Sequence, residues 1–279
     1  MVKKSLKFDW SETKEKMKTE KETSKKGDER FWNLKREKGT EEGTALIRFL
    51  PDPDKIPYIM LFHHFVKYIS DEGSENIYSG TCLTSIGKDC PICNLNKKYW
   101  NSGHESDKEI ARGRKRKKTY ISNILVIDDK GNPANNGKVF LFSYGSTIFE
   151  KIENQVFPKN DFDEPITVWD FYEGANFILQ STKKDGYVNY DNSKFTKVGP
   201  ISNTDEDIEA IWNKTVSLSE FLDETKIDNS EQIKEKLSGI FTKVGSSIPK
   251  ADEFMEAKTV SVDSLEDNLD EGIESDIPF

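Results

Sequence analysis

The sequence predicts a mainly β fold with some helices, an α+β class arranged around a small antiparallel barrel. Several short segments are rich in β-branched and aromatic residues and are separated by turn residues, few segments have helical spacing, and no internal repeat is present. The 279 residues suffice for one large domain or two small ones.

Four segments carry the clearest strand patterns. TALIRFLPD (44–52) alternates and ends in a Pro-Asp-Pro turn, and IPYIMLFHHFVKY (56–68) is a long β-rich run. YISNILVIDD (120–129) and KVFLFSYG (138–145) are separated by a loop rich in Gly, Asn and Pro. This spacing predicts that the last two strands form a hairpin.

The second half of the chain mixes helical and strand patterns. Residues 146–157 have helical spacing of apolar side chains, and residues 205–222 form an acidic amphipathic pattern. Residues 175–195 predict a second hairpin that turns at 184–186, where the sequence is Lys-Asp-Gly. One further helix is expected near 231–243.

Charge divides the chain into three parts. Residues 251–279 contain ten acidic residues and one lysine, which leaves 40 acidic and 40 basic residues in 1–250, so this end carries the whole net charge of −9. Residues 1–27 contain nine lysines and five acids. We therefore predict a basic N-terminal arm (1–27), a folded body (28–246), and an acidic linker and disordered tail (247–279).

Composition also bears on location and class. No apolar run approaches the roughly 20 residues that span a bilayer, so no membrane partner is expected. The opening MVKKSLKFDW has no apolar core behind its lysines, unlike a signal peptide. Three cysteines without a secretion signal favour a reducing, cytoplasmic setting over a disulfide scaffold.

All three cysteines lie in CLTSIGKDCPIC (82–93). The thiolates of Cys90 and Cys93, at i and i+3, can bind one metal ion, and Cys82 lies a short loop away. Thioredoxin-like redox sites share the Cys-x-x-Cys spacing, but they lie between a strand and a helix, whereas here we expect β-hairpins on both sides. The cluster therefore predicts a structural zinc site.

Three histidines are candidates for the fourth ligand: His63, His64 and His104. Neighbouring residues of a strand point to opposite faces, so only one of His63 and His64 can join the cysteines. His104 follows in a polar segment ten residues or so past Cys93. Residue patterns alone leave this choice open.

RGRKRKK (112–118) places six bases in seven residues and runs directly into a strand. By itself this run fits a nucleic-acid-binding segment and a solvated loop or localisation-like patch equally well. Aromatic residues on or near the neighbouring strands change this balance, because a basic groove beside stacking rings binds single-stranded nucleic acid without sequence preference. One strand face must also build the core, so not every ring is available. The aromatic residues are Tyr120, Phe140, Phe142, Tyr144, Tyr187, Tyr190 and Phe195.

Several ordered motifs together resemble a known family. They are GTALIRFLPD, IMLFHHF, the Cys82/CPIC spacing, KRKKTY-ISNILV, GKVFLFSYG, YEGANFIL and DGYVNYDNSKF. The combination, over roughly residues 30–222, resembles the helix-destabilising single-stranded DNA-binding protein of T-even-type bacteriophages.

The resemblance implies an OB-fold, a five-stranded barrel, with an inserted zinc subdomain at about 60–110 and flanking helices. It implies one structural Zn²⁺, held by one histidine and three cysteines. In that family the histidine is followed by one residue and then a Phe, which selects His63 here together with Cys82, Cys90 and Cys93.

The resemblance also implies DNA contacts. Ile121, and Ile110 less directly, stand where the family has aromatic residues, so we expect fewer stacked bases and a larger electrostatic contribution. The expected DNA-binding residues are Arg112, Arg114, Lys115, Arg116, Lys117, Lys118, Tyr120, Phe142, Tyr144, Tyr187 and Tyr190.

The two ends of the chain carry the partner predictions. Lys3, Lys4 and Ser5 form a reduced version of the family's self-association motif, which implies cooperative binding along the strand. The final Asp276, Ile277, Pro278 and Phe279 resemble the tip of bacterial single-stranded DNA-binding proteins, which docks on replication and repair partners.

The sequence thus predicts a non-enzymatic protein that binds single-stranded DNA in phage replication, recombination and repair, in the cytoplasm of the infected bacterial host. Two alternatives remain at this stage. One is a zinc-dependent nuclease or related nucleic-acid enzyme, against which the absence of a hydrolytic motif such as His-Glu-x-x-His stands. The other is a zinc-ribbon regulator that binds duplex DNA.

Overall fold

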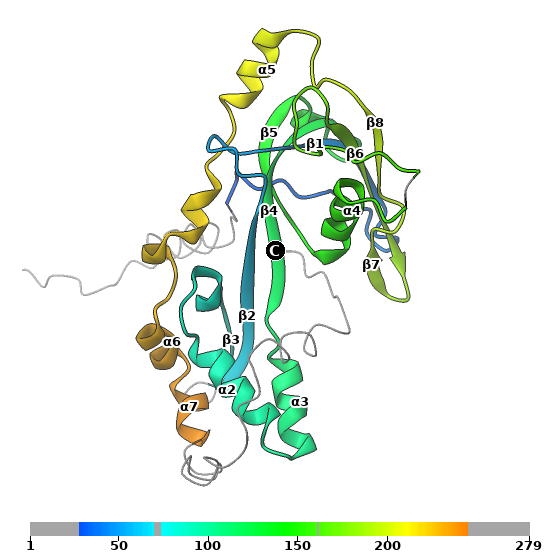
Figure 1. Cartoon of the computed structure of the whole chain (residues 1–279). Helices are drawn as coiled ribbons and strands as arrows, with labels where there is room; N and C mark the ends of the chain where they lie inside the picture. Colours follow the sequence, from blue (N-terminus) through cyan, green and yellow to red (C-terminus); the bar gives the residue numbers. More distant parts are fainter. Residues whose placement is uncertain (1–27, 70–73, 161, 245–279) are drawn as a thin grey trace, which may run out of the picture.

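The computed structural model describes residues 28–69, 74–160 and 162–244 (Figure 1). The predicted arm, with Lys3, Lys4 and Ser5, lies outside the described residues. The predicted tail, with Asp276, Ile277, Pro278 and Phe279, also lies outside them.

Eight antiparallel strands form the sheet, and β4 is its central member. One edge of β4 pairs first with β2 and then, further along, with β1, while its other edge pairs with β5. The predicted hairpin of the third and fourth strand segments is confirmed by the β4–β5 pairing. The strands are β1 Gly43–Leu50, β2 Ile59–Ile69, β3 Glu75–Thr81, β4 Lys117–Asp129, β5 Lys138–Tyr144, β6 Ala175–Lys184, β7 Tyr187–Asn189 and β8 Lys194–Val198.

The predicted second hairpin is also confirmed, since β6 pairs with β7 across a tight turn. Asp185 and Gly186 occupy the turn with φ of 53° and 89°. An Asp-Gly pair tolerates this left-handed backbone, which explains why the chain reverses there.

Helices differ more from the sequence predictions. The expected helix over 205–222 ends at Trp212, and four residues further on the buried Asn123 side chain binds both the N–H and the carbonyl of Val216. Two helices follow the cysteines where β-hairpins were expected, the first with Pro91 at its first position. The helices are α2 Pro91–Trp100, α3 Glu105–Gly113, α4 Ser146–Val156, α5 Asp205–Trp212, α6 Ser230–Lys236 and α7 Ser238–Val244, with 3₁₀ turns that include η1 Leu83–Ile86 and η3 Leu218–Leu222.

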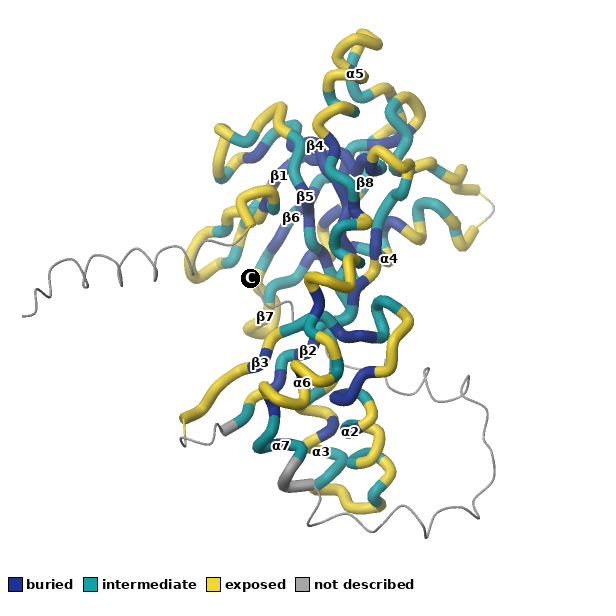
Figure 2. The backbone as a smooth tube through the Cα atoms, turned by 90° about the vertical axis from the view of Figure 1, so that its left-hand side faces the viewer, coloured by how far each residue is buried: buried dark blue, intermediate teal, exposed yellow. Residues whose placement is uncertain are grey.

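The long strands β2 and β4 join two bodies (Figure 1). The upper body comprises β1, β5, β6, β7, β8 and α4, and α5 lies at its far end. The lower lobe comprises β3, α2, α3, α6 and α7 with the adjoining ends of β2 and β4. Figure 2 shows buried backbone running through both bodies, so each has its own core.

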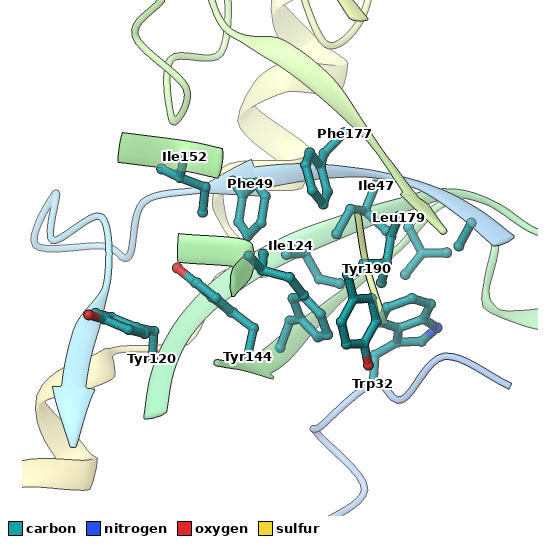
Figure 3. Close-up of a cluster of buried hydrophobic side chains, with 14 of the residues drawn as sticks. Trp32, Ile47, Phe49, Tyr120, Ile124, Tyr144, Ile152, Phe177, Leu179 and Tyr190 are labelled. Carbon is teal, nitrogen blue, oxygen red and sulfur yellow. The ribbon is translucent and has the colours of Figure 1, made fainter. Parts of the chain in front are cut away.

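Aromatic and aliphatic side chains fill the upper core (Figure 3). Phe49 and Phe177 are fully buried at its centre, with ring centroids 5.7 Å apart. Trp32 enters from the segment before β1 and donates a hydrogen bond of 2.9 Å from its indole N–H to Asp129. The start of the described chain is therefore anchored to β4.

The lower core combines distant parts of the sequence. Cys82 and Cys90 pack in one cluster with Val66 of β2 and with Ile233 and Leu237 of the C-terminal helices. Helices α6 and α7 therefore complete the core of the cysteine-containing lobe, although about 140 residues separate Cys90 from them in the sequence.

The described strands and helices establish the α+β class, while the OB-fold barrel stays a prediction. None of the helices in the described ranges is long and apolar enough to cross a membrane.

Asn123 provides a test of this architecture. Replacing it by alanine removes the partner of the half-buried N–H and carbonyl of Val216 and empties a fully buried site, which together cost about 2–4 kcal/mol of unfolding free energy. Urea unfolding measures this loss, and Asn33→Ala on the surface is the control, with a change within about 0.5 kcal/mol. Equal stability of the two variants would contradict the role assigned to Asn123.

Candidate metal centre and nucleic-acid interface

Four side chains in the lower lobe converge on one point: His64, Cys82, Cys90 and Cys93. Their ligand atoms all lie within 4.8 Å of one another. Nε2 of His64 is 3.4 Å from Sγ of Cys90 and 3.5 Å from Sγ of Cys93. Sγ atoms of Cys82 and Cys93 are also 3.5 Å apart.

The predicted ligand His63 is corrected to His64 by the strand register. His63 faces Thr81 across the β2–β3 pair, so these two side chains share one face of the sheet. Cys82 follows Thr81 and therefore points to the other face, as do His64 and its partner position Gly80. The alternation argument correctly limited the site to one histidine, and the register selects the second of the two.

These donors fit a closed tetrahedral metal site. Zinc–sulfur bonds of about 2.3 Å correspond to tetrahedral edges of about 3.8 Å, close to the separations observed. Burial alone would lower the pKa of His64, but hydrogen bonds to the Cys82 and Cys90 sulfurs raise it to about 9. Hydrogen bonds from Cys90 and Cys93 hold the pKa of Cys82 far below the usual thiol range. The hydrogen bond to the Cys82 sulfur raises the pKa of Cys93 in turn, so the cluster holds thiol protons that a divalent cation would displace on binding.

Secondary structure presents the ligands from three elements. His64 lies on β2, Cys82 directly follows β3, and Cys90 and Cys93 begin α2. The backbone N–H of Cys82 donates to the carbonyl of Phe62 at 2.7 Å, which ties the end of β3 to β2. Four protein ligands leave no open coordination position, as in structural rather than catalytic sites.

The predicted basic run lies beside this cluster. Arg112 is in the last turn of α3, Arg114 and Lys115 lead away from it, and Lys117 and Lys118 begin β4. Nδ2 of Asn96 on α2 donates to the carbonyl of Arg114 at 2.9 Å. The helix that has Cys90 at its N-cap and Cys93 in its first turn therefore also holds the backbone of the basic run.

Arg116 is connected to the cysteines through one side chain. Its guanidinium donates from Nη1 to Oγ1 of Thr84 at 2.8 Å, and the same hydroxyl is 3.1 Å from Sγ of Cys82. Ser85, next in η1, accepts a hydrogen bond of 2.8 Å from the backbone N–H of Phe62. The turn that follows the first cysteine thus positions both a cation and a ring.

Four cations of the basic run lie over aromatic rings. The guanidinium carbon of Arg116 is 3.9 Å from the Phe62 centroid, and Nζ of Lys117 is 5.7 Å from that of Phe65. Phe62 and Phe65 lie on opposite faces of β2, so the two cation–ring contacts also lie on opposite faces of this strand. We call the whole set the cation–aromatic row: Arg112 over Trp100 (5.6 Å), Arg114 over Tyr99 (5.5 Å), Arg116 over Phe62 and Lys117 over Phe65.

The structure changes the prediction for the aromatic contacts. Only Tyr187 among the five expected rings is well exposed, at 61%, on the β6–β7 hairpin. The other four are core residues with at most 7% exposure, and Tyr120 is covered by Phe149 at a centroid distance of 3.9 Å. Rings enclosed in this way offer no face to a base in this conformation. The four are Tyr120, Phe142, Tyr144 and Tyr190.

Sequence reasoning also missed the half-buried rings of the cation–aromatic row. Tyr99 and Trp100 form an aromatic pair at the end of a polar helix, 12 residues before the basic run, and this pairing was the available signal. Phe62 and Phe65 carried no such signal, because a β-rich run contains rings for core packing as well. Of the two noted departures, Ile121 is buried and Ile110 is 39% exposed on α3.

Comparison with known proteins places this geometry in a family. A family model described as gp32 DNA binding protein like matches residues 41–241. The chain belongs to this gp32-like family. It is 31% identical to the single-stranded DNA-binding protein of Enterobacteria phage T4 over 246 residues, which cover 86% of this chain and 77% of that protein. It is 32% identical to the single-stranded DNA-binding protein of Enterobacteria phage T2 over 216 residues, 75% of this chain and 69% of that protein.

The resemblance inferred from the motifs is thereby confirmed. The gp32-like match includes the metal cluster and the whole cation–aromatic row. It begins after the lysine-rich segment and ends before the acidic one, so both ends of this gp32-like chain lie outside the matched region.

The register argument yields a direct test. His64→Ala removes one of four donors and is expected to lower the bound metal from about one ion per chain to well below half, measured by elemental analysis after dialysis. His63→Ala is the matched control and is expected to keep its metal. The opposite pattern would restore the ligand that sequence reasoning selected.

Proposed function

We propose that this protein binds single-stranded DNA without strong sequence preference and without catalysing a reaction. The cation–aromatic row carries this proposal, because alternating cations and rings suit a flexible strand whose phosphates and bases need different partners. The names of the phage T4 and T2 relatives support it.

DNA binding would replace the cation–ring contacts within the protein by contacts of the cations with phosphates and of the rings with bases. Phosphates compete for the guanidinium and ammonium groups, and the rings they leave become available for base stacking, which contributes about 1–3 kcal/mol per base. Tyr187 and the six bases Arg112, Arg114, Lys115, Arg116, Lys117 and Lys118 belong to this proposed surface. The four buried aromatic residues support it from the core.

We assign the metal as one structural Zn²⁺ held by His64, Cys82, Cys90 and Cys93. When bound, the ion fixes the relative positions of β2, the end of β3 and the start of α2. The residues of η1 and α2 then hold Arg116, Phe62 and the backbone of Arg114 in place. The zinc lobe would be inserted in an OB-fold that provides the rest of the DNA surface.

The wider role follows from the proposed activity. The protein would coat strands exposed in phage DNA replication, recombination and repair in the cytoplasm of the infected host. The lysine-rich arm would mediate cooperative binding through Lys3, Lys4 and Ser5. The acidic tail would recruit replication and recombination proteins through its last four residues.

A fluorescence titration that compares poly(dT) with duplex DNA tests this function. We expect preference for poly(dT) and, with about six phosphate contacts, a slope of log K against log salt near −4. Arg116→Gln should reduce the slope by about 0.7, and Lys130→Gln, an exposed charge at the other end of β4, should leave it unchanged.

Two outcomes would contradict the proposal. Tighter binding to duplex than to poly(dT) would favour the regulator that binds duplex DNA. Release of product from labelled single-stranded DNA with Mg²⁺ or Zn²⁺ would favour a nuclease.

The acidic tail gives a separate prediction. Deleting residues 251–279 removes ten acidic residues that compete with DNA for the basic run. Binding of the truncated protein to poly(dT) should tighten several-fold at low salt and by little at high salt. Unchanged affinity at low salt, with the same partners still recruited, would exclude this role.

A further inference from the structure

A hollow of about 350 Å³ lies beside α5, at the opposite end of the molecule from α2 and α3 (Figures 1 and 2). One wall is a stripe along α5, because positions 205, 208, 209 and 212 recur at helical spacing and share one face of that helix. The segment before β6 forms the other wall. The lining residues are Phe171, Tyr172, Asp205, Ile208, Glu209 and Trp212.

A buried arginine ties together the two segments that carry these walls. Arg48 of β1 is only 1% exposed, and its Nη2 donates to the carbonyls of Asp170 at 2.7 Å and Gly199 at 2.9 Å. The backbone N–H of Ile201 also donates to the carbonyl of Phe171 at 2.8 Å. The segment before β6 and the segment that leads to α5 are therefore held against each other, so the hollow is formed before any ligand binds.

Aromatic rings form much of the surface of the hollow. Phe171 and Trp212 pack edge to face with centroids 5.5 Å apart, and Tyr172 is 52% exposed. The hydroxyl of Tyr172 donates to Asp205 at 3.0 Å, so this ring is held beside a carboxylate. The hollow thus offers fixed ring surfaces to a ligand.

Two carboxylates give the hollow its charge. Asp205 and Glu209 are exposed, and neither forms an ion pair with a lysine or arginine in the described part of the chain. Residues 168–176 and 198–213, which include both walls, contain no basic residue. Because the two acids are four residues apart on one helix face, their Cβ atoms are about 5–6 Å apart.

Rings beside paired carboxylates match the chemistry of an aliphatic diamine. Each ammonium group is attracted by a carboxylate and by an aromatic face, and the methylene chain between them packs on the rings. A hydrated Mg²⁺ ion gains nothing from rings and keeps most of its water, and phosphate is repelled by the carboxylates. The combination therefore selects an organic cation with two charges.

We infer that the hollow is a binding site for aliphatic diamines and polyamines. One ammonium group binds at Asp205 and a second at Glu209, and the methylene chain lies against Tyr172 and Trp212. The hollow and the cation–aromatic row lie at opposite ends of the molecule, so this binding is independent of the proposed DNA surface. A bound polyamine stabilises the folded protein by mass action.

Fluorine NMR of the full-length protein labelled with 5-fluorotryptophan tests the site without DNA. The chain has five tryptophans, and Trp212→Phe identifies the resonance of Trp212. Addition of 1,4-diaminobutane should shift this resonance with saturation, while those of Trp32 in the upper core and Trp100 on α2 stay in place. Equal shifts of all three resonances, or no shift of Trp212, would overturn the inference.

A matched pair of variants separates the site from general negative charge. Glu209→Gln should raise the diamine concentration at half-saturation by about 3–10-fold. Glu206→Gln makes the same charge change on α5 outside the hollow and should leave it unchanged. Equal effects of the two variants would show attraction to the acidic surface alone and would contradict the site.

Three further ligands distinguish the possible sources of an ammonium group. Butylamine has a single charge, Nα-acetyl-lysine amide represents a lysine of a partner protein, and MgCl₂ represents an inorganic cation. Each should need a concentration about 3–10-fold higher than the diamine to shift the Trp212 resonance, or should fail to shift it. Equal potency of the lysine derivative would assign the hollow to a protein partner, and equal potency of MgCl₂ would reduce it to counterion accumulation, so either result would overturn the diamine site.

Discussion

The convergence of His64, Cys82, Cys90 and Cys93 is the constraint on which the lower lobe depends. The lobe is small, and its strands and helices would otherwise be joined only by a modest core. A metal ion bound by these four side chains would close the loop between β2 and α2, and in small metal-binding domains such closure contributes folding energy directly. Because η1 and α2 carry Thr84, Ser85 and Asn96, the same closure fixes groups that reach the basic run.

The metal cluster and the cation–aromatic row are thus held in place by the same two elements, η1 and α2. A guanidinium on a flexible stem loses conformational entropy when it binds DNA, and the hydrogen bond to Thr84 already restricts Arg116. Preorganised cations keep more of their interaction energy for the ligand. A metal ion bound by the cluster would thereby be physically connected to the proposed DNA surface.

The two ends of the molecule are chemically opposite. The lower lobe presents cations over rings, while the α5 end presents carboxylates around rings. Helices α6 and α7 return the chain to the lower lobe, where Ile233 and Leu237 share a core with the cysteines. The described part of the chain therefore ends in the lobe that holds the four-residue metal cluster and much of the basic run.

Sequence alone determined the strands with strong alternation, both hairpins, the three cysteines and the basic run, because these depend on local pattern and spacing. It also showed that only one of two adjacent histidines could join the cysteines, and it left His104 as a further candidate. Tertiary structure decided the rest. Register between β2 and β3 selected His64, since a one-residue shift would turn every side chain to the other face. Burial decided which rings are core, because Tyr120 and Phe142 have the same chemistry as exposed rings and differ only in what covers them. The helix ends at Trp212, and Asn123, about 90 residues away in the sequence, binds the backbone of Val216 beyond that end; no local pattern contains such a contact.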